Sequence, residues 1–447
     1  MKKLKIICFE VWKIFELAYP ISISNLSSIL MGIIDNIMIG RVGYEYLAAS
    51  SLANGIYYLI VIFGTGLSYA VAPLVSMLNG ANKTNKTEEL LHSANFLAII
   101  ISIILTIAIY FGSDLIYFLG QEKKIEIEAI KYLKILSLGT PFFVLFMIQK
   151  QFVDGFHFTL PGMSISIIAN AANVFLNYLL IYGKFGFPEL KLEGAGWATN
   201  ISRLIMLAMI MIYLSFYFNK IRVNYLSFVK SIKKEFFRKV LRLGVGSSFQ
   251  YFFEMGAFTF AGIMIGWLGA RQLSAHQIAL NLATLTYMIV LGISSAGSIR
   301  IAKYYSSKKI YRARKAGLSA LLLAICFMFL SCLAFIIFRS DIPKLYVDDN
   351  ETIIIASKLF IIAGLFQIFD GAQATGLGLL RGMNDVKYPT LTTFFSYWII
   401  SLSASYFFGF ILRYDVIGVW IGFLLGLIFS AASLNSRFLF LTKINKL

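Results

Sequence analysis

The sequence predicts an all-α polytopic membrane protein, with twelve transmembrane helices in two pseudo-symmetric six-helix bundles. Three observations predict this fold class. The 447 residues are 59% hydrophobic and only 14% charged, and the mean hydropathy is +0.78, which leaves a water-soluble protein too little polar surface. The apolar residues lie in long stretches joined by short connections. Finally, the order of motifs in the first half of the chain recurs in the second half.

Each expected span is a stretch long enough to cross a bilayer, which takes roughly 20 predominantly apolar residues in a helix. The alternation over about ten residues that marks barrel strands is absent, and the short connections leave no room for a sizeable soluble domain. The expected spans are residues 14–39, 50–77, 93–118, 129–153, 160–183, 194–217, 240–267, 277–302, 315–338, 351–380, 389–411 and 416–440.

The internal repeat relates the first six spans to the last six. The matched segments are 36–54 with 262–281, 153–161 with 380–389, and 196–199 with 419–422. The repeat predicts an N-lobe at residues 1–217, a basic cytoplasmic linker at 218–239 and a C-lobe at 240–447. Because six is an even number, both halves enter the membrane from the same side. The lobes should therefore be related by an axis along the membrane normal, as in transporters with parallel repeats.

The formal net charge of +18 could indicate nucleic-acid binding or membrane topology. Its distribution favours topology, because the basic residues gather in the connections that face inside if the N-terminus is inside. The linker 218–239 and residues 303–315 are the densest of these connections. This asymmetry follows the positive-inside rule for a multi-pass membrane protein with both termini cytoplasmic. We expect no nucleic-acid partner.

Three carboxylates stand alone inside apolar spans, at Asp35, Glu254 and Asp370. A carboxylate at mid-depth in a bilayer costs several kcal/mol unless it faces a cavity or a partner, so each is a functional candidate. Such a group can exchange a proton for a cationic ligand, which is the elementary step of antiport. The alternative is a neutral, hydrogen-bonded carboxylic acid without a functional role. The repeat places Ser28 opposite Glu254 and Ala261 opposite Asp35, which predicts two lobes with different specialisations.

Two amides in the fifth span add oxygen ligands to this set. Asn173 and Asn177 are four residues apart, so they project from one face of a helix. Carboxylate and amide oxygens suit Na⁺ or a carboxyl group that gains and loses H⁺. Asp35, Asn173 and Asn177 therefore form a candidate Na⁺ site. The alternative for the two asparagines is a hydrogen bond that holds neighbouring helices together.

The sequence lacks the residue patterns that metal binding, ATP use or enzyme catalysis would require. His276 and Gln277 begin the eighth span, where we expect an interfacial polar pair, and the three histidines show no metal-ligand spacing. No phosphate-binding GxxxxGK[ST] loop occurs, so ATP is not expected as a direct energy source. An intramembrane enzyme would need paired catalytic groups, which the acids in two different lobes do not supply. We expect no enzyme activity and no cofactor.

In these residues and motifs, the chain resembles the multidrug and toxic compound extrusion (MATE) family, in its NorM-like bacterial branch. The resemblance covers nearly the whole chain. It depends on segments in both halves, in one order. These are Pro20, Asp35 to Gly40, Leu176 to Gly183, Gly194 to Thr199, Glu254, Ser274 to Asn281, and Leu380 to Gly382 after Asp370.

Membership implies twelve helices in two lobes, alternating access, and export of cationic organic compounds or amphipathic drugs in exchange for H⁺ or Na⁺. In the family, an N-lobe cation site matches Asp35, Asn173 and Asn177, and Thr199 in the sixth-span motif completes it. A C-lobe site matches Glu254 and Asp370. The tyrosine that the family has one turn before Asp370 is Phe366 here, which removes an oxygen and argues against strong Na⁺ binding in the C-lobe.

The sequence and the resemblance thus predict a monomeric secondary active exporter of the bacterial inner membrane, in which an inward-moving ion at a buried carboxylate drives release of the substrate outside. H⁺ and Na⁺ both stay open as the coupling ion, and Asp35 is the first candidate for the coupling group. The alternative is a flippase of lipid-linked oligosaccharides or other amphipathic lipids. A flippase would need extra helices or a more cationic central cavity.

Overall fold

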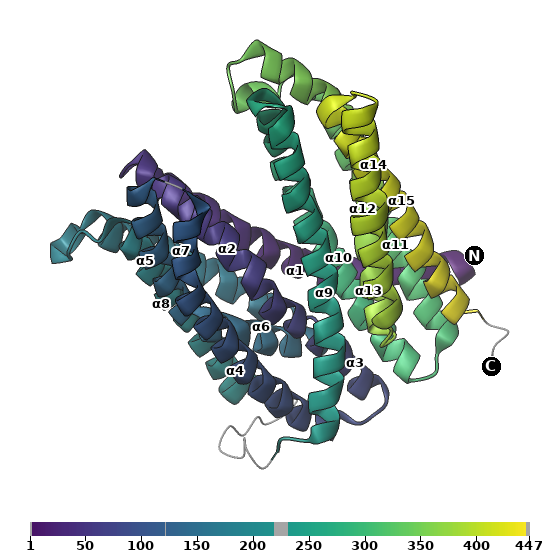
Figure 1. Cartoon of the computed structure of the whole chain (residues 1–447). Coiled ribbons are helices and arrows are strands. Elements are labelled where there is room, and N and C mark those ends of the chain that lie inside the picture. The colour runs from purple at the N-terminus through teal and green to yellow at the C-terminus, as the bar shows by residue number, and fades with distance from the viewer. Residues whose placement is uncertain (1, 121, 219–230, 444–447) are drawn as a thin grey trace. The chain divides into compact units, whose positions relative to one another are not determined.

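The computed structural model describes residues 2–120, 122–218 and 231–443, and this part of the chain is helical without a strand (Figure 1). Eleven helices in it are long and apolar enough to cross a membrane, or twelve if one bent pair counts as a single span. The predicted all-α membrane fold with twelve transmembrane helices in two bundles is confirmed. Most of the predicted linker lies outside the described residues, because residues 219–230 are not among them.

The helices divide into two compact units. The N-terminal unit is Ile23–Ser248, and the C-terminal unit is Met1–Ser22 with Phe249–Leu447. Two long helices contribute to both units, α1 (Lys2–Gly40) and α9 (Lys234–Leu268). The predicted lobes 1–217 and 240–447 keep each of these helices in one lobe. In the compact units, the first part of α1, up to Ser22, belongs to the C-terminal unit, and the first part of α9, up to Ser248, belongs to the N-terminal unit. The repeat in the sequence does not reveal this division.

Apart from α1 and α9, the described residues of the N-terminal unit form seven α-helices. They are α2 (Tyr44–Ser68), α3 (Val71–Gly80), α4 (Thr87–Gly112), α5 (Lys123–Leu138), α6 (Thr140–Gly155), α7 (Leu160–Tyr182) and α8 (Lys191–Ile212). A hydrophobic core joins α1, α2, α5 and α8 and includes the fully buried Tyr57 and Tyr132. The turn after α7 needs a left-handed residue, and Gly183 supplies it with φ 62°.

The C-terminal unit continues with α10 (Ala270–Ser306), α11 (Ile310–Ile337), α12 (Asn350–Gly382), α13 (Lys387–Phe394), α14 (Leu402–Tyr406) and α15 (Asp415–Leu441). Asp349 caps α12, because its carboxylate accepts the Thr352 N–H at 3.0 Å and the Thr352 hydroxyl at 2.7 Å. These hydrogen bonds hold the pKa of Asp349 below its usual value. The cap fixes the start of the helix that carries Asp370.

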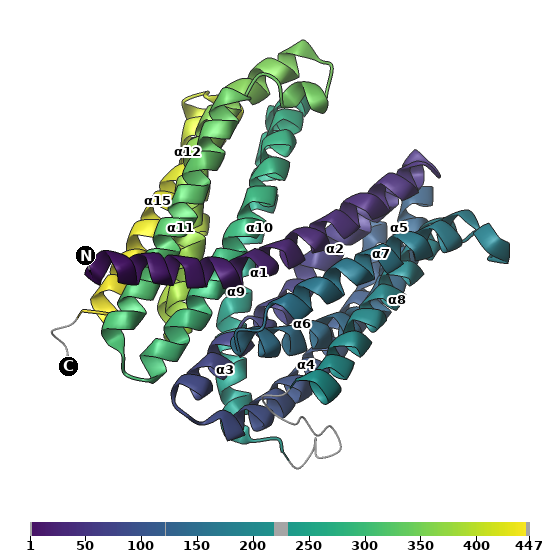
Figure 2. The ribbon, with the colours of Figure 1, turned by 180° about the vertical axis from the view of Figure 1, so that it is seen from behind.

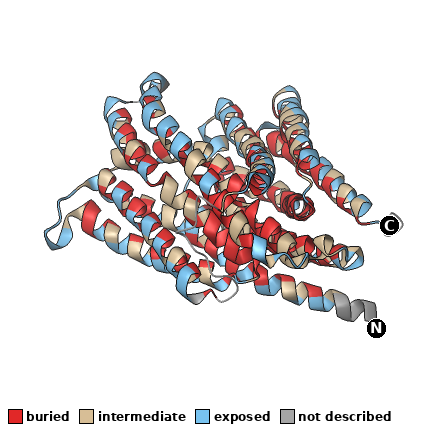
Figure 3. Cartoon of the chain, turned by 90° about the horizontal axis from the view of Figure 1, so that it is seen from below, coloured by how far each residue is buried: buried red, intermediate tan, exposed pale blue. Residues whose placement is uncertain are grey.

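The large apolar side chains that remain exposed indicate lipid-facing surfaces. Along α4, the side chains of Ile103, Ile104, Ile107 and Phe111 are all exposed. A water-soluble monomer rarely shows so continuous an apolar face. Figure 3 shows buried and exposed residues sharing the same helices, with the buried ones gathered where helices meet. This pattern fits helices that contact each other on one side and hydrocarbon on the other.

The span predicted at residues 129–153 is broken. It consists of α5 and α6, which meet at Gly139 with a bend of 44°. Pro141 stands in the first turn of α6, where a backbone N–H would have no acceptor within the helix, so the missing N–H of proline costs no hydrogen bond. The break frees carbonyl groups of the last turn of α5, and other helices satisfy them. The donors are Asn200 Nδ2 to the Ile135 carbonyl (2.6 Å), Arg203 Nη1 to Leu136 (3.4 Å) and Thr106 Oγ1 to Ser137 (3.1 Å).

The last helical hairpin packs closely through glycine. Gly418, Gly422 and Gly426 recur every four residues on α15, and a Cβ at any of them would overlap atoms of residues 396–409 on the preceding span. That span contains wide π-helical turns at Phe395–Ser401 and Phe407–Ile411. Small residues at such contacts allow the backbones of membrane helices to approach each other.

We expect Gly422→Ala to lower the free energy of unfolding by about 1–3 kcal/mol, because the added methyl group has no space against Ser405. Thermal unfolding in detergent micelles measures the effect. The matched control is Gly266→Ala in α9, where a Cβ would meet nothing within 4 Å. Equal melting temperatures for the two variants would contradict the expected clash.

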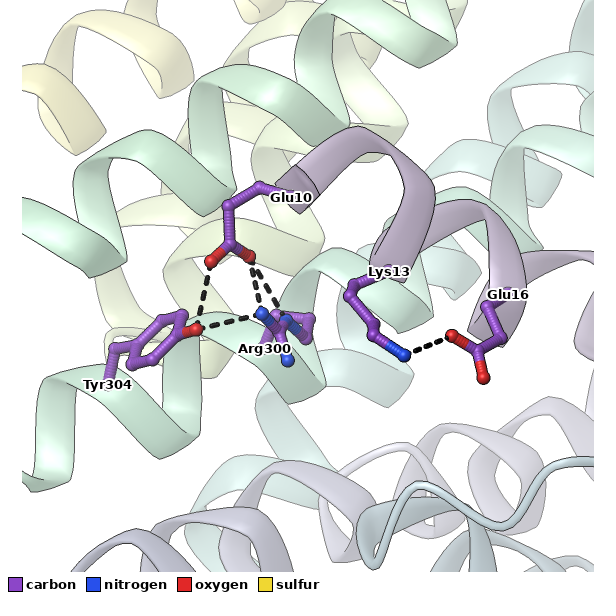
Figure 4. Close-up of polar contacts among 5 residues, drawn as sticks. All are labelled: Glu10, Lys13, Glu16, Arg300 and Tyr304. Atoms are coloured by element: carbon purple, nitrogen blue, oxygen red, sulfur yellow. Dashed lines mark hydrogen bonds and ion pairs between the residues drawn. The ribbon is translucent and has the colours of Figure 1, made fainter. Parts of the chain in front are cut away.

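The N-terminal segment of α1 is attached to the C-terminal unit by a buried ionic network (Figures 2 and 4). Glu10 is 3% exposed and Arg300 of α10 is 9% exposed. The guanidinium donates to Glu10 Oε2 from Nη2 at 2.6 Å and from Nε at 3.2 Å, and the Tyr304 hydroxyl donates to Oε1 at 2.9 Å. The charges of Glu10 and Arg300 therefore neutralise each other inside the protein.

Candidate functional site

The structure brings the four predicted N-lobe residues together around Asp35. Asp35 on α1 is 5% exposed, and Asn173, Asn177 and Thr199 are buried as well. Asn177 Nδ2 donates to Asp35 Oδ1 at 2.5 Å, and the Thr199 hydroxyl donates to Asp35 Oδ2 at 3.3 Å. Asn177 Nδ2 also lies 3.2 Å from Asn173 Oδ1. Each carboxylate oxygen thus accepts a donor, which suits an ionised Asp35.

Helix geometry explains the convergence. Asn173 and Asn177 are one turn apart on α7, so both amides project from the same face. Thr199 lies in the first half of α8, which pairs with α7 across the Gly183 turn. At Gly194, a Cβ would meet the backbone of Leu180. This close approach of α7 and α8 places Thr199 beside the asparagines.

Two polar atoms in this cluster remain available to a ligand. Within the described residues, Asn177 Oδ1 and Asn173 Nδ2 are buried and have no hydrogen-bond partner. Leaving a buried polar atom unpaired costs free energy, so such atoms often mark a place for a ligand or water. A free amide oxygen beside a carboxylate fits the donor set of a monovalent cation, and the carboxylate alone fits a proton. The residues present can therefore bind either a proton or a monovalent cation.

The C-terminal unit holds the other two predicted acids. Glu254 on α9 is 8% exposed and Asp370 on α12 is 4% exposed, and their charges interact. The hydroxyls of Tyr287 on α10 and Tyr397 lie beside Glu254. In the described part of the chain, Glu254 Oε2 and both of these hydroxyls lack a partner in strict hydrogen-bond geometry. The cluster is thus loosely satisfied, in contrast to the closely hydrogen-bonded Asp35.

The acidic pair has phenolic oxygens beside it even though residue 366 is a phenylalanine. The Phe366 ring is buried in an aromatic cluster, 5.3 Å from Trp420 and 6.0 Å from Phe258 between ring centroids. Tyr287 and Tyr397 supply hydroxyls from other helices instead. The sequence did not identify these two tyrosines, because 24 tyrosines in an apolar chain give no signal of which ones face a carboxylate.

Further buried charges within the spans escaped the sequence prediction. Asp154 on α6 is 1% exposed, and its carboxylate lies 3.7 Å from the ammonium group of Lys150, which is also buried. Arg203 on α8 is 6% exposed. A charged residue inside an apolar stretch was the available signal. Lys150 stands inside the expected span 129–153, and Asp154 is the first residue after that span, although the structure includes it in α6 (Thr140–Gly155).

His276, which we expect near the membrane interface, is buried among protein side chains. It is 3% exposed, and its Nδ1 accepts a hydrogen bond from Trp420 Nε1 at 3.1 Å. The helix begins at Ala270, more than a turn earlier than predicted, so His276 lies within α10 and not at its start.

The fold and the site define the class of protein. The chain is a helical multi-pass membrane protein with an internal repeat, and each of its two compact units holds buried carboxylates. The chain belongs to the MatE family, whose model matches residues 20–179 and again residues 247–407. The two matched segments also support the repeat predicted from the motifs.

Similar proteins extend over nearly the full length. The chain is 32% identical to "Multidrug resistance protein NorM" of Aliivibrio fischeri over 97% of this chain and 95% of that protein. It is 31% identical to the protein of the same name from Vibrio cholerae, over 97% and 96%. Among solved structures, an outward-facing multidrug resistance MATE family transporter of the MOP superfamily matches with a TM-score of 0.88 at 19% identity, covering 98% of this chain and 97% of that one. The predicted resemblance to the NorM-like branch is confirmed.

Proposed function

We propose that this protein is a secondary active multidrug exporter, which moves organic cations or amphipathic drugs out of the cell in exchange for H⁺ or Na⁺ by alternating access. The observation that carries the proposal is the buried Asp35, held by Asn177 and Thr199 and bordered by the unfilled oxygen of Asn177. Similar proteins that carry the name "multidrug resistance protein" support the substrate class.

The chemistry follows from the charge of one carboxylate. An ionised Asp35 attracts a cationic substrate, and a proton or Na⁺ that binds there removes the attraction. Because the substrate and the ion compete for one carboxylate, uptake of one favours release of the other. The gradient of the ion then supplies the free energy for export. Glu254 and Asp370 form a second place where the same exchange can occur.

We further propose a monomer in the bacterial inner membrane with both termini cytoplasmic. The basic residues support this orientation, since Lys308 and Lys309 stand exposed between α10 and α11 and Arg312 is exposed in the first turn of α11. Such residues are retained on the cytoplasmic side during insertion.

Proteoliposomes containing the purified protein test the function. We expect ethidium to accumulate or leave against its gradient when a pH or Na⁺ gradient is imposed, and not when the gradient is dissipated with an ionophore. A parallel assay with fluorescent lipids measures flipping. Lipid flipping without ion-driven ethidium transport would contradict the proposal and favour the flippase alternative. The ion whose gradient drives transport is the coupling ion.

A further inference from the structure

Arg203 is a buried cation one helical turn beyond Thr199 on α8. Its Nη1 donates to the Tyr57 hydroxyl at 2.7 Å and to the Leu136 carbonyl at 3.4 Å. The guanidinium carbon lies 4.9 Å from the ring centroid of Tyr57 and 5.3 Å from that of Phe143. All of these partners are uncharged. Arg203 therefore keeps its positive charge inside the N-terminal unit.

Ion pairing does not neutralise that charge. Two ion pairs among the described residues are deeply buried on both sides, Lys150 with Asp154 and Arg300 with Glu10, and neither includes Arg203. Arginine remains protonated in proteins, so the site must accommodate the charge. Ring faces attract a cation. The end of α5 also contributes, since the last carbonyls of a helix carry partial negative charge.

The position of Arg203 connects it to Asp35. Thr199 and Arg203 are four residues apart and therefore lie on one face of α8. Thr199 contacts the Asp35 carboxylate directly, and the charge of Arg203 acts on Asp35 through space. The other groups around Asp35 are the amides of Asn173 and Asn177 and the phenols of Tyr58 and Tyr132. Asp35 and Arg203 are thus the opposite charges of this cluster.

We propose that Arg203 is the resident counter-cation of the Asp35 site, which turns ion binding at Asp35 into active repulsion of a cationic substrate. With Asp35 ionised, the two charges sum to zero. With a proton or Na⁺ on Asp35, the cluster carries one net positive charge. Without Arg203, ion binding at Asp35 would change the net charge of the cluster from −1 to zero. The cationic substrate would then no longer be attracted, but it would not be repelled. The inference extends the proposed function, in which an ion and a cationic substrate compete for Asp35.

The partners of Arg203 keep its positive charge in place while Asp35 binds or releases a proton or Na⁺. Its guanidinium is held by the break between α5 and α6, at Leu136, and by the hydroxyl of Tyr57 on α2. Both partners are uncharged hydrogen-bond acceptors in these contacts. In a low-dielectric interior, a fixed charge acts over the distance of one or two helical turns. Arg203 is therefore a specificity-determining residue that acts through Asp35.

Binding of two dyes to the purified protein in detergent tests this role without requiring transport. Ethidium and propidium share a phenanthridinium ring and carry one and two positive charges. We compare their Kd values for the wild type, Arg203→Met, which removes the charge but keeps an unbranched side chain, and Arg203→Lys, which keeps the charge. Arg203→Gln is the second neutral variant, and it retains a donor for the Leu136 carbonyl if the methionine variant does not fold.

We expect the neutral variants to bind ethidium about tenfold more tightly and propidium about a hundredfold more tightly, because Coulomb repulsion scales with ligand charge. The lysine variant should keep the wild-type ratio of the two Kd values. A purely structural role would change both dyes by the same factor. Equal changes for the two dyes, unchanged Kd values, or a lysine variant that behaves as the neutral ones do would overturn the inference. Failure of the proposed function would show separately, as absent ion-driven transport in proteoliposomes.

Discussion

The Asp35→Asn variant is expected to lose ion-driven efflux completely while remaining folded. The substitution keeps the shape of the side chain but removes its charge and its titratable proton, so no ion can be exchanged there. The new amide oxygen can still accept the hydrogen bond from Asn177. The Thr199 hydroxyl loses its carboxylate acceptor. Losing this one hydrogen bond costs about 1 kcal/mol. Arg203 keeps its direct contacts with Tyr57 and Leu136, so the substitution breaks no direct ion pair and the protein should stay folded.

Dye efflux from proteoliposomes under an imposed pH or Na⁺ gradient measures the loss, and size-exclusion chromatography with thermal unfolding verifies the fold. The matched control is Asp370→Asn, which removes a buried carboxylate from the C-terminal unit. We expect it to retain part of the transport. Undiminished efflux in Asp35→Asn would remove Asp35 from the coupling mechanism. Loss of transport in Asp370→Asn alone would assign coupling to the C-terminal unit.

The membrane spans were predictable because length and hydropathy determine them. The span expected at 160–183 is α7 at Leu160–Tyr182, and the span expected at 416–440 is α15 at Asp415–Leu441. In lipid, the backbone has few alternatives to a continuous helix. The broken span was not predicted, because the break at Gly139 leaves hydropathy unchanged. Gly139 followed by Pro141 was the only local signal.

Half of the candidate N-lobe geometry was also predictable. The spacing of Asn173 and Asn177 determines that they share a helix face, and periodicity suffices for that. The contact of this face with Asp35 joins residues 142 positions apart in the chain. Hydrophobic patterns do not specify such pairings, and the family resemblance supplied them. Arg203 illustrates the limit, since its partners Tyr57, Leu136 and Phe143 come from three other helices.

The division of the chain into units illustrates the same limit. The repeat relates the halves as sequences, and it places α1 entirely in the first half. Packing instead assigns residues up to Ser22 to the C-terminal unit. Ser22 Oγ, at the end of this segment, donates to the Ile289 carbonyl at 2.9 Å. The charged residue that holds the segment is Glu10, in the first third of α1. A lone glutamate near the N-terminus of a basic segment would normally be read as a solvated residue, and its partner Arg300 lies 290 positions away.

Breaking that pair is expected to give the largest change in stability. Glu10→Gln should lower the free energy of unfolding by about 3–5 kcal/mol, because it leaves Arg300 buried without a counter-charge. The double variant Glu10→Gln with Arg300→Met removes both charges and should recover a large part of the loss. Tyr304→Phe removes only one hydrogen bond to Glu10 and should cost about 1 kcal/mol. Thermal and chemical unfolding in detergent micelles measure all three.

The exposed pair on the same helix is the control, since Lys13 and Glu16 lie 2.6 Å apart with side chains 39% and 51% exposed (Figure 4). Glu16→Gln should cost less than about 1 kcal/mol. Because Glu10 attaches only the start of α1, its loss should appear first as faster hydrogen exchange in residues 7–22, before the remainder of the C-terminal unit responds. Similar losses for Glu10→Gln and Glu16→Gln would show that the buried network does not anchor the helix. A double variant that is no more stable than Glu10→Gln alone would also contradict the prediction. The cost of Glu10→Gln would then not come from the uncompensated charge of Arg300.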